Sequence, residues 1–140
     1  MSLRKKEIFV QTRATEEVQD ITAAVDAAIR ELGLADGLVL LFCPHTTAAL
    51  TVNENADPDV REDFRRAFAQ MIPKISFSHT EGNSPAHVRA ALLGPSLLLP
   101  VEGGRLALGT WQGVYFCEFD GPRRRRVWVY ALVEADATKS

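Results

Sequence analysis

The sequence contains little of what would place it in a specialised class of protein. Its two cysteines, Cys43 and Cys117, both lie inside apolar runs, so we expect reduced core thiols and neither a disulfide nor a zinc pair. No apolar run reaches membrane-spanning length, and residues 1–6 lack the apolar core of a signal peptide. A formal net charge of −2 gives no general reason to expect binding to nucleic acid or to a membrane. We therefore expect a cytoplasmic protein.

Several familiar catalytic motifs are also absent. The chain has no Walker phosphate loop, no glycine fingerprint for dinucleotides, no nucleophile elbow and no zinc-binding His-Glu-x-x-His pair. With 140 residues, 46% of them hydrophobic, it is long enough to bury a core, and no repeat or linker divides it. These features predict a single domain over residues 1–140.

Hydrophobic patterning predicts strands near both ends of the chain and helices within its first two thirds. The expected strands span residues 6–12, 38–43, 46–52, 96–101, 106–109, 113–119 and 125–133. Two longer helices are expected after the capping residues Asp20 and Asp57, and a short one runs from its N-cap Ser84 to a stop at Gly94. Because strands and helices do not alternate, the pattern favours an α+β fold with antiparallel or mixed sheets.

The loop before the short helix has features of an anion site. N–H groups at a helix start attract anions, and Gly82 and Asn83 can adopt unusual backbone angles just before it. Two of the three histidines, His79 and His87, flank this start, and imidazole can bind a metal ion or act as a base. The alternative is a capped surface helix with two incidental histidines.

Four further clusters combine polar, charged and aromatic side chains. They are His45, Thr46 and Thr47; Asn53, Glu54 and Asp57; Thr110, Trp111 and Gln112; and the arginines 123–126, which follow an Asp-Gly-Pro turn. The tryptophan offers a flat face to a ring-shaped ligand, and an arginine can clamp a phosphate through two hydrogen bonds. Each cluster also has a structural explanation: a hairpin corner with a hydrogen-bonded histidine, a helix cap, a core tryptophan and a solvated strand edge.

Together these clusters resemble the YjbQ-like family, also called the secondary thiamine-phosphate synthase family. The resemblance covers nearly the whole chain, with motifs in matching order at residues 44–50, 53–54, 79–87, 92–96, 109–112 and 118–123. It implies a compact α+β domain with β-sandwich character that assembles as a homotrimer. It also implies a weak thiamine-phosphate synthase activity, which joins a hydroxymethylpyrimidine diphosphate to a thiazole phosphate.

The resemblance further implies a site at His45, His79 and His87, with Glu81 and Asn83 nearby. Three imidazoles are a common ligand set for a catalytic zinc ion, and Glu81 could orient one of them. One shared pocket could therefore hold a divalent metal (Zn or Mg) or a small phosphorylated ligand, and the sequence leaves both open. The residues expected to contact the substrate or anion are Thr46, Thr47, Gly82, Asn83, Ser84, Thr110, Trp111, Gln112 and Arg123. The roles of Arg124 and Arg126 stay open, because only about half of an arginine run on a strand can share one surface.

Distance along the chain suggests that more than one subunit forms the site. If the strands on either side of His45 form a hairpin, Asn53 lies on the order of 25 Å away along one strand. We therefore expect Asn53, Glu54 and Asp57 to reach the pocket from a neighbouring subunit.

The expected function, as the resemblance implies, is a synthase-like enzyme. The alternatives are a non-catalytic trimeric module that binds an anion or metal, and a metal-assisted hydrolase.

Overall fold

The computed structural model describes residues 2–133, which form eight strands and three helices. The elements are β1 (Ser2–Gln11), β2 (Glu17–Asp20), α1 (Thr22–Leu32), β3 (Gly37–Phe42), β4 (Ala48–Glu54), α2 (Pro58–Gln70), α3 (Ser84–Leu93), β5 (Ser96–Glu102), β6 (Arg105–Leu106), β7 (Gln112–Glu118) and β8 (Arg124–Val133). In the described part of the chain, no helix combines the length and the apolar character needed to cross a membrane.

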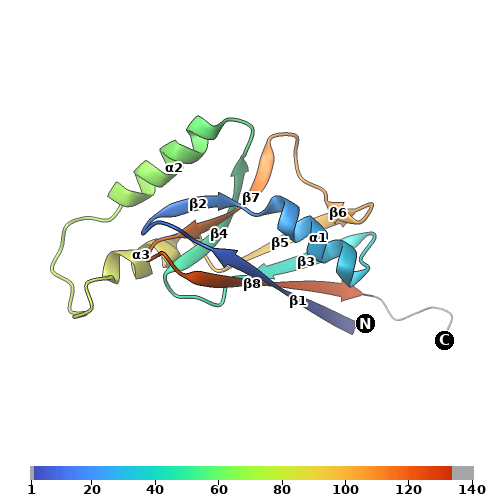
Figure 1. Ribbon diagram of the computed structural model, residues 1–140, viewed down its shortest axis with the longest axis horizontal. Helices are drawn as coiled ribbons and strands as arrows, with labels where there is room; N and C mark the ends of the chain where they lie inside the picture. The colour runs from blue at the N-terminus through green and yellow to red at the C-terminus, as the bar shows by residue number, and fades with distance from the viewer. Residues whose placement is uncertain (1, 134–140) are drawn as a thin grey trace.

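The strands form two antiparallel sheets. The larger has the order β1-β8-β3-β5-β6 and the smaller the order β2-β7-β4. In Figure 1, α1 lies across the strands, while α2 and α3 lie toward the opposite end of the molecule. The arrangement confirms the expected single α+β domain with antiparallel sheets and three helices.

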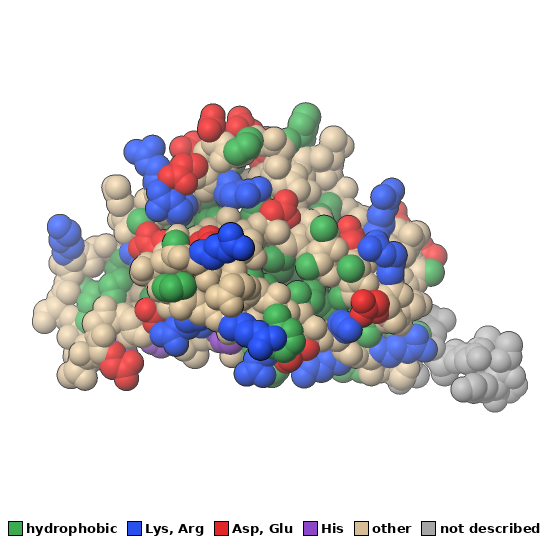
Figure 2. Space-filling view, viewed as in Figure 1, with side chains coloured by type: hydrophobic (Ala, Val, Ile, Leu, Met, Phe, Trp, Pro, Cys, Tyr) green, Lys and Arg blue, Asp and Glu red, His purple; other side chains and the backbone are tan. Residues whose placement is uncertain are grey.

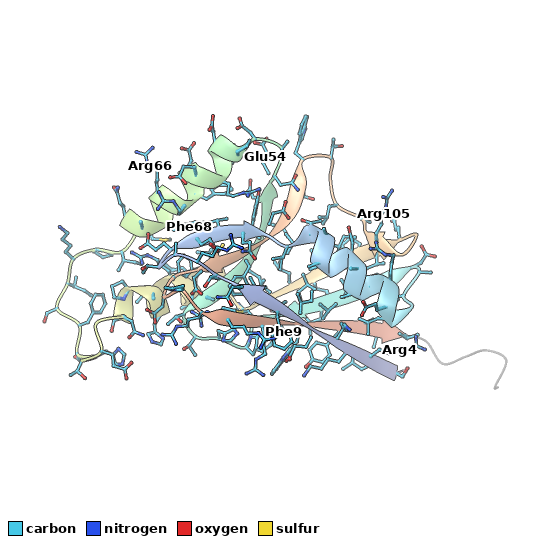
Figure 3. The ribbon with its side chains drawn as sticks, viewed as in Figure 1. Arg4, Phe9, Glu54, Arg66, Phe68 and Arg105 are labelled. Atoms are coloured by element: carbon cyan, nitrogen blue, oxygen red, sulfur yellow. The ribbon has the colours of Figure 1, made fainter. Side chains whose placement is uncertain are left out.

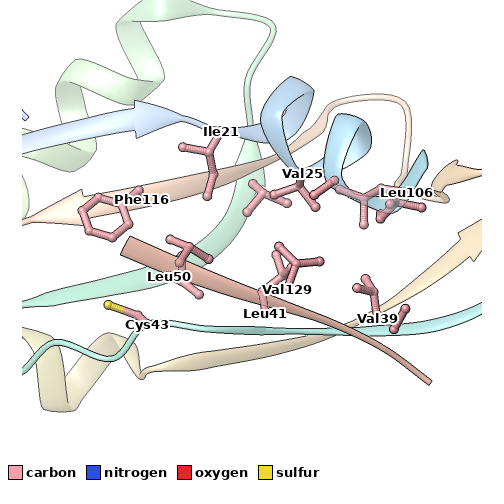
Figure 4. Close-up of a cluster of buried hydrophobic side chains, with 14 of the residues drawn as sticks. Ile21, Val25, Val39, Leu41, Cys43, Leu50, Leu106, Phe116 and Val129 are labelled. Carbon is pink, nitrogen blue, oxygen red and sulfur yellow. The ribbon is translucent and has the colours of Figure 1, made fainter. Parts of the chain in front are cut away.

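One hydrophobic core joins both sheets to α1. Leu41 and Val129 of the larger sheet pack in the same cluster as Leu50 and Phe116 of the smaller sheet and Val25 of α1, as Figure 4 shows. Each of these side chains is at most 1% exposed. Burial of this apolar surface is the main stabilising contribution to the fold.

The continuous apolar run at residues 38–43 is typical of a strand buried on both faces, but the structure buries only one face of it. Val39 and Leu41 are fully buried, but Leu38 and Leu40 are 46% and 37% exposed. The strand does lie between two neighbours, β5 and β8. Because α1 and the smaller sheet cover only the inner face of the larger sheet, alternate apolar residues of β3 point outward.

The structure also corrects the predicted hairpin around His45. β3 pairs with β5 and β8, whereas β4 pairs with β7 in the other sheet. The segment from Pro44 to Thr47 therefore carries the chain from one sheet to the other. Proline has no N–H to donate to a ladder, which suits a residue that ends a strand.

Of the three predicted caps, only Asp57 occupies the N-cap position, where its carboxylate accepts the N–H of Asp59 at 2.9 Å. At α1 the prediction is one residue too early: the N-cap is Ile21, although the Asp20 carboxylate does accept the N–H of Thr22 at 2.9 Å. At α3 the prediction is one residue too late, because Ser84 is already helical and Asn83 occupies the N-cap position. The Asn83 side chain makes no capping bond and instead binds a loop on the far side of the candidate site.

Candidate functional site

Three connecting segments meet around one open cleft of about 370 Å³. The β3–β4 connection contributes His45 and its neighbours, the loop before α3 contributes Glu81 and Asn83, and the turn after β7 contributes Asp120. The lining residues are Pro44, His45, Thr46, Thr47, Glu81, Asn83, His87, Asp120, Arg123 and Arg125. The cleft thus brings together His45, His87, Glu81 and several of the residues expected to contact an anion.

His45 is held by a backbone hydrogen bond that fixes its tautomer. Its Nε2 accepts the N–H of Arg126 at 2.9 Å, so this nitrogen carries no proton. Burial lowers the pKa of His45, and the positive charges of Arg125 and Arg126 lower it further. The ring is therefore neutral near pH 7, and Nδ1 carries the proton. Nδ1 is a hydrogen-bond donor in this state and has no lone pair for a metal ion.

A chain of polar contacts connects the two sides of the cleft. The Asp120 carboxylate accepts a hydrogen bond from Asn83 Nδ2 at 3.0 Å and one from Arg123 Nη2, also at 3.0 Å. Arg123 Nε also donates to the Asp120 carbonyl at 2.8 Å. The Arg123 side chain is 55% exposed, so water competes for its charge and the guanidinium can turn toward a ligand.

Beneath the cleft lies a buried ion pair that the sequence analysis did not include among the site residues. Arg125 Nε donates to Glu118 at 2.8 Å, and Arg125 Nη2 donates both to Glu118 and to the Thr47 hydroxyl. Glu118 also accepts the Thr12 hydroxyl at 2.7 Å and the N–H groups of Phe119 and Asp120. Burial raises the pKa of Glu118, but these hydrogen bonds lower it more, so the carboxylate is ionised.

The arginine run alternates between the two faces of β8. Arg125 points inward and is 4% exposed, whereas Arg124 stacks over Phe9 at 4.0 Å on the outer face. Arg126 is exposed as well, and its guanidinium lies 3.7 Å from Glu7. This alternation was the one available signal for an inward-facing arginine, and it assigns Arg124 and Arg126 to the outer surface.

His79 and His87 lie together, but His79 is outside the main cleft. Their rings are 5.6 Å apart and nearly perpendicular, and His79 Nε2 lies 3.9 Å from Glu81. Both rings line a neighbouring hollow with Phe77 and Val88, and only His87 also lines the cleft of His45. Within residues 2–133, no three His, Cys, Asp or Glu side chains are arranged to hold a metal ion. The zinc or magnesium site stays a prediction.

The start of α3 has fewer free N–H groups for an anion than the sequence predicts. Pro85 has no N–H, and the N–H groups of Ala86 and His87 both bind the Asn83 carbonyl, at 3.0 and 3.3 Å. Ser84 faces the hollow of His79, and Gly82 takes a positive φ of 80° at the turn into the helix. Side chains, more than helix amides, are therefore the donors at this site.

The remaining predicted contacts lie at the other end of the smaller sheet. Glu54 pairs with Gln112 at one end of the β4–β7 ladder, and Ala48 pairs with Glu118 at the end near the cleft. The two pairs are six residue positions apart along β4, which is about 20 Å. Trp111 is 62% exposed, and Figure 3 shows Glu54 beside the start of α2. Within one chain, none of the residues Asn53, Glu54, Asp57, Thr110, Trp111 and Gln112 lines the cleft.

The family model described as "UPF0047 protein YjbQ-like" matches residues 6–134. The chain belongs to the YjbQ-like family. It is 48% identical over 126 residues to the UPF0047 protein YugU of Bacillus subtilis, which covers 89% of this chain and 96% of that protein. It is 46% identical over 121 residues to a UPF0047 protein of Methanocaldococcus jannaschii, with 86% and 88% covered.

Solved structures of similar proteins support the fold. A YjbQ-like protein from Sulfolobus solfataricus, described as of unknown function, has 34% identity and a TM-score of 0.87, covering 95% of this chain and 99% of that one. An uncharacterised YjbQ/UPF0047 protein from Clostridium acetobutylicum has 49% identity and a TM-score of 0.83, covering 89% and 97%. This confirms the predicted family and fold.

The same comparisons overturn the expected activity. The matching family is named only as an uncharacterised one, and none of these relatives is described as a thiamine-phosphate synthase. The prediction of synthase activity is therefore wrong. The motifs that suggested it identify a fold and a polar cleft, and neither specifies a reaction.

Proposed function

We propose that the cleft of His45 binds a small anion, with phosphate as its simplest form. The observation that carries the proposal is the hydrogen bond from the Arg126 N–H to His45 Nε2, which makes Nδ1–H a donor. The exposed guanidinium of Arg123 and the hydroxyl of Thr46 line the same cleft. Donors of this kind match the oxygens of a phosphate.

Two carboxylates, Asp120 and Glu81, also line the cleft, and their negative charge repels an anion. Asp120 is paired with Arg123 and Asn83, while Glu81 is 74% exposed and can turn away into water. An incoming phosphate competes with Asp120 for the Arg123 guanidinium. Affinity is then set by how much of that ion pair must break.

An enzymatic role would place proton transfer on His87. His87 lines the cleft from the first turn of α3, and no hydrogen bond to its ring is present within residues 2–133. A histidine at the edge of an anion site can donate or accept a proton on a bound ligand. His87 would thus act on a ligand that the other donors of the cleft already hold.

We also infer that the chain works as a homotrimer, through the outer face of the larger sheet. Leu40 and Leu98 are cross-strand neighbours there, 37% and 65% exposed, and no described helix covers them. Lys5 lies 3.8 Å above Trp128 on the same face. Figure 2 shows Lys and Arg side chains along this lower edge of the molecule. An apolar sheet face bordered by cations is typical of a protein interface, and a neighbour could supply Trp111 or Glu54 to the cleft.

Calorimetric titration with sodium phosphate tests the anion site. We expect saturable binding to the wild type and its loss in His45→Leu, which keeps the apolar bulk of the ring but removes Nδ1–H. Thermal unfolding of the variant controls for folding. A wild type that binds no phosphate but purifies with stoichiometric metal, lost in His45→Ala, His79→Ala and His87→Ala, would favour the metal site instead.

Light scattering tests the assembly. We expect a trimer mass for the wild type and a smaller mass for Leu98→Lys, which places a charge on the apolar face. Leu92→Lys is the matched control, because Leu92 is 62% exposed on α3, away from that face. A monomeric wild type at micromolar concentration contradicts the inference.

The cytoplasmic location stays a prediction.

A further inference from the structure

Beside the cleft lies a second hollow of about 270 Å³. Its walls include Thr15 from the β1–β2 loop and Arg89 from α3. It shares Asn83 and Asp120 with the cleft of His45, so the two spaces adjoin at the residues that form the Asn83–Asp120 hydrogen bond. A ligand held in the cleft would therefore have this hollow as an adjacent space.

Two buried polar atoms on the walls of this hollow have no partner in the described residues. Arg89 is 8% exposed; its Nη2 donates to the Ala69 carbonyl at 2.7 Å and its Nη1 lies 3.4 Å from Glu16, but its Nε has no acceptor. Asn83 uses Nδ2 for Asp120, and its Oδ1 has no donor. An unpaired buried donor or acceptor is destabilising, so such atoms are normally satisfied by a protein group, by water or by a ligand.

We propose that this hollow binds the hydroxylated part of a phosphorylated ligand whose phosphate occupies the cleft of His45, so that the ligand is a sugar or polyol phosphate. The inference rests on the anion site proposed above. A hydroxyl group both donates and accepts hydrogen bonds. One hydroxyl can accept from Arg89 Nε, and its neighbour can donate to Asn83 Oδ1, after a small turn of each side chain that uncovers the buried atom toward the hollow.

The hollow beside His79 favours a different kind of ligand. It is lined by Phe77, Val88 and the two histidines, and neither unpaired atom belongs to its walls. An apolar ring could enter it without satisfying any buried group. The Arg89 side therefore favours a hydroxylated ligand, and the His79 side would favour an aromatic one.

Three phosphate compounds separate these expectations. We expect ribose 5-phosphate to bind the wild type at least about tenfold more tightly than inorganic phosphate or phenyl phosphate, since each of the two added hydrogen bonds contributes about fivefold in affinity. Thr15→Phe narrows the hollow from its exposed rim, and the Thr15 carbonyl can still accept the Gly121 N–H. We expect this variant to lose the preference for ribose 5-phosphate and to keep its affinity for inorganic phosphate.

The matched control is Val88→Phe, which narrows the other hollow and should keep the preference for ribose 5-phosphate. If none of the compounds binds, the anion site fails and the inference fails with it. If phosphate binds and ribose 5-phosphate gains nothing, only the hydroxyl subsite is overturned. Tightest binding of phenyl phosphate, abolished by Val88→Phe, also overturns it. The comparison of three compounds on the wild type decides even if a variant does not fold.

Discussion

Arg123 and Arg125 are only two residues apart, yet their surroundings are opposite. Arg125 is 4% exposed and bonded to a carboxylate that is itself 1% exposed, whereas the Arg123 side chain is 55% exposed beside Asp120. Buried ion pairs are poorly screened and costly to break, while exposed pairs contribute little to stability. The same residue type therefore fixes the shape of the site at one position and remains available to a ligand at the other.

The buried pair also determines the shape of the cleft. Glu118 accepts the N–H groups of Phe119 and Asp120, which places the turn that carries Asp120. Arg125 holds the Thr47 hydroxyl at 2.8 Å, which places the β3–β4 connection beside His45. Two walls of the cleft are thus fixed from below by one carboxylate–guanidinium pair.

The largest expected effect comes from breaking that pair. Arg125→Met leaves the Glu118 carboxylate buried without its main partner. We expect the free energy of unfolding to fall by about 3–5 kcal/mol, measured by urea denaturation. The double variant Glu118→Leu with Arg125→Met removes both charges and should recover part of the loss. Arg123→Met is the exposed control, with an expected loss below about 1 kcal/mol. Equal losses for the two single variants would refute the distinction.

The second expected effect is on phosphate affinity. Here Arg123 matters more than Arg125, the reverse of their expected effects on stability. Arg123→Ala should weaken phosphate binding by about tenfold or more, because a hydrogen bond to a charged group contributes about 1.5–3 kcal/mol. Calorimetry measures it, and thermal unfolding should change little. Arg124→Ala is the control, since Arg124 stacks over Phe9 on the outer face. A similar loss in both variants would assign the effect to overall charge and not to the cleft.

Much of the fold follows from the sequence, because alternation and capping are local properties. Asp20 and Asp57 mark helix starts through hydrogen bonds to residues two positions away, which any sequence reading can find. The assignment of β3 and β4 to different sheets is not local. It depends on β7 and β8, more than fifty residues further along the chain. The strand β2 was missed because its mixed, largely polar residues show no clear alternation.

The site divides in the same way. His45, His87 and Asn83 were predicted from motifs and do line one cleft. Arg125 was not included, because charged residues in a run read as solvated, and only the pleat of β8 turns this one inward. Glu118, at the end of the apolar strand β7, was not included because its partner Arg125 was not recognised as buried. The sequence likewise could not show that the far ends of β4 and β7, with Trp111, lie away from the cleft.

A smaller effect should come from Asp120→Asn. This variant removes the charge that pairs with Arg123 while its side chain can still accept from Asn83. Phosphate no longer competes with a carboxylate, so we expect affinity to rise several-fold, the gain of about 1 kcal/mol that an exposed ion pair can represent. Glu81→Gln tests the other carboxylate and should have less effect, because Glu81 is 74% exposed. Weaker binding in Asp120→Asn would show that Asp120 places Arg123 and does not compete for it.

The smallest expected effect concerns the titration of His45. Burial and the charges of Arg125 and Arg126 lower its pKa below the ordinary value of about 6.5. A lowered pKa in the folded state means that His45 contributes stability that is present above the unfolded-state pKa and is lost as pH falls through the folded-state pKa. Protonation also places a proton on Nε2, which then cannot accept the Arg126 N–H. Acid should therefore weaken both the fold and this contact.

Arg126→Gln separates the charge from the hydrogen bond. It removes one positive charge near His45 and keeps the backbone N–H that Nε2 accepts. We expect the pKa of His45 to rise, measured by NMR from the chemical shift of the ring Cε1 proton as a function of pH. Lys6→Gln removes a surface charge that pairs with Glu31 and should leave the titration unchanged. If the pKa of His45 does not rise in Arg126→Gln, the exposed Arg126 is screened by water even at this short range, and burial together with the buried charge of Arg125 accounts for the neutral ring.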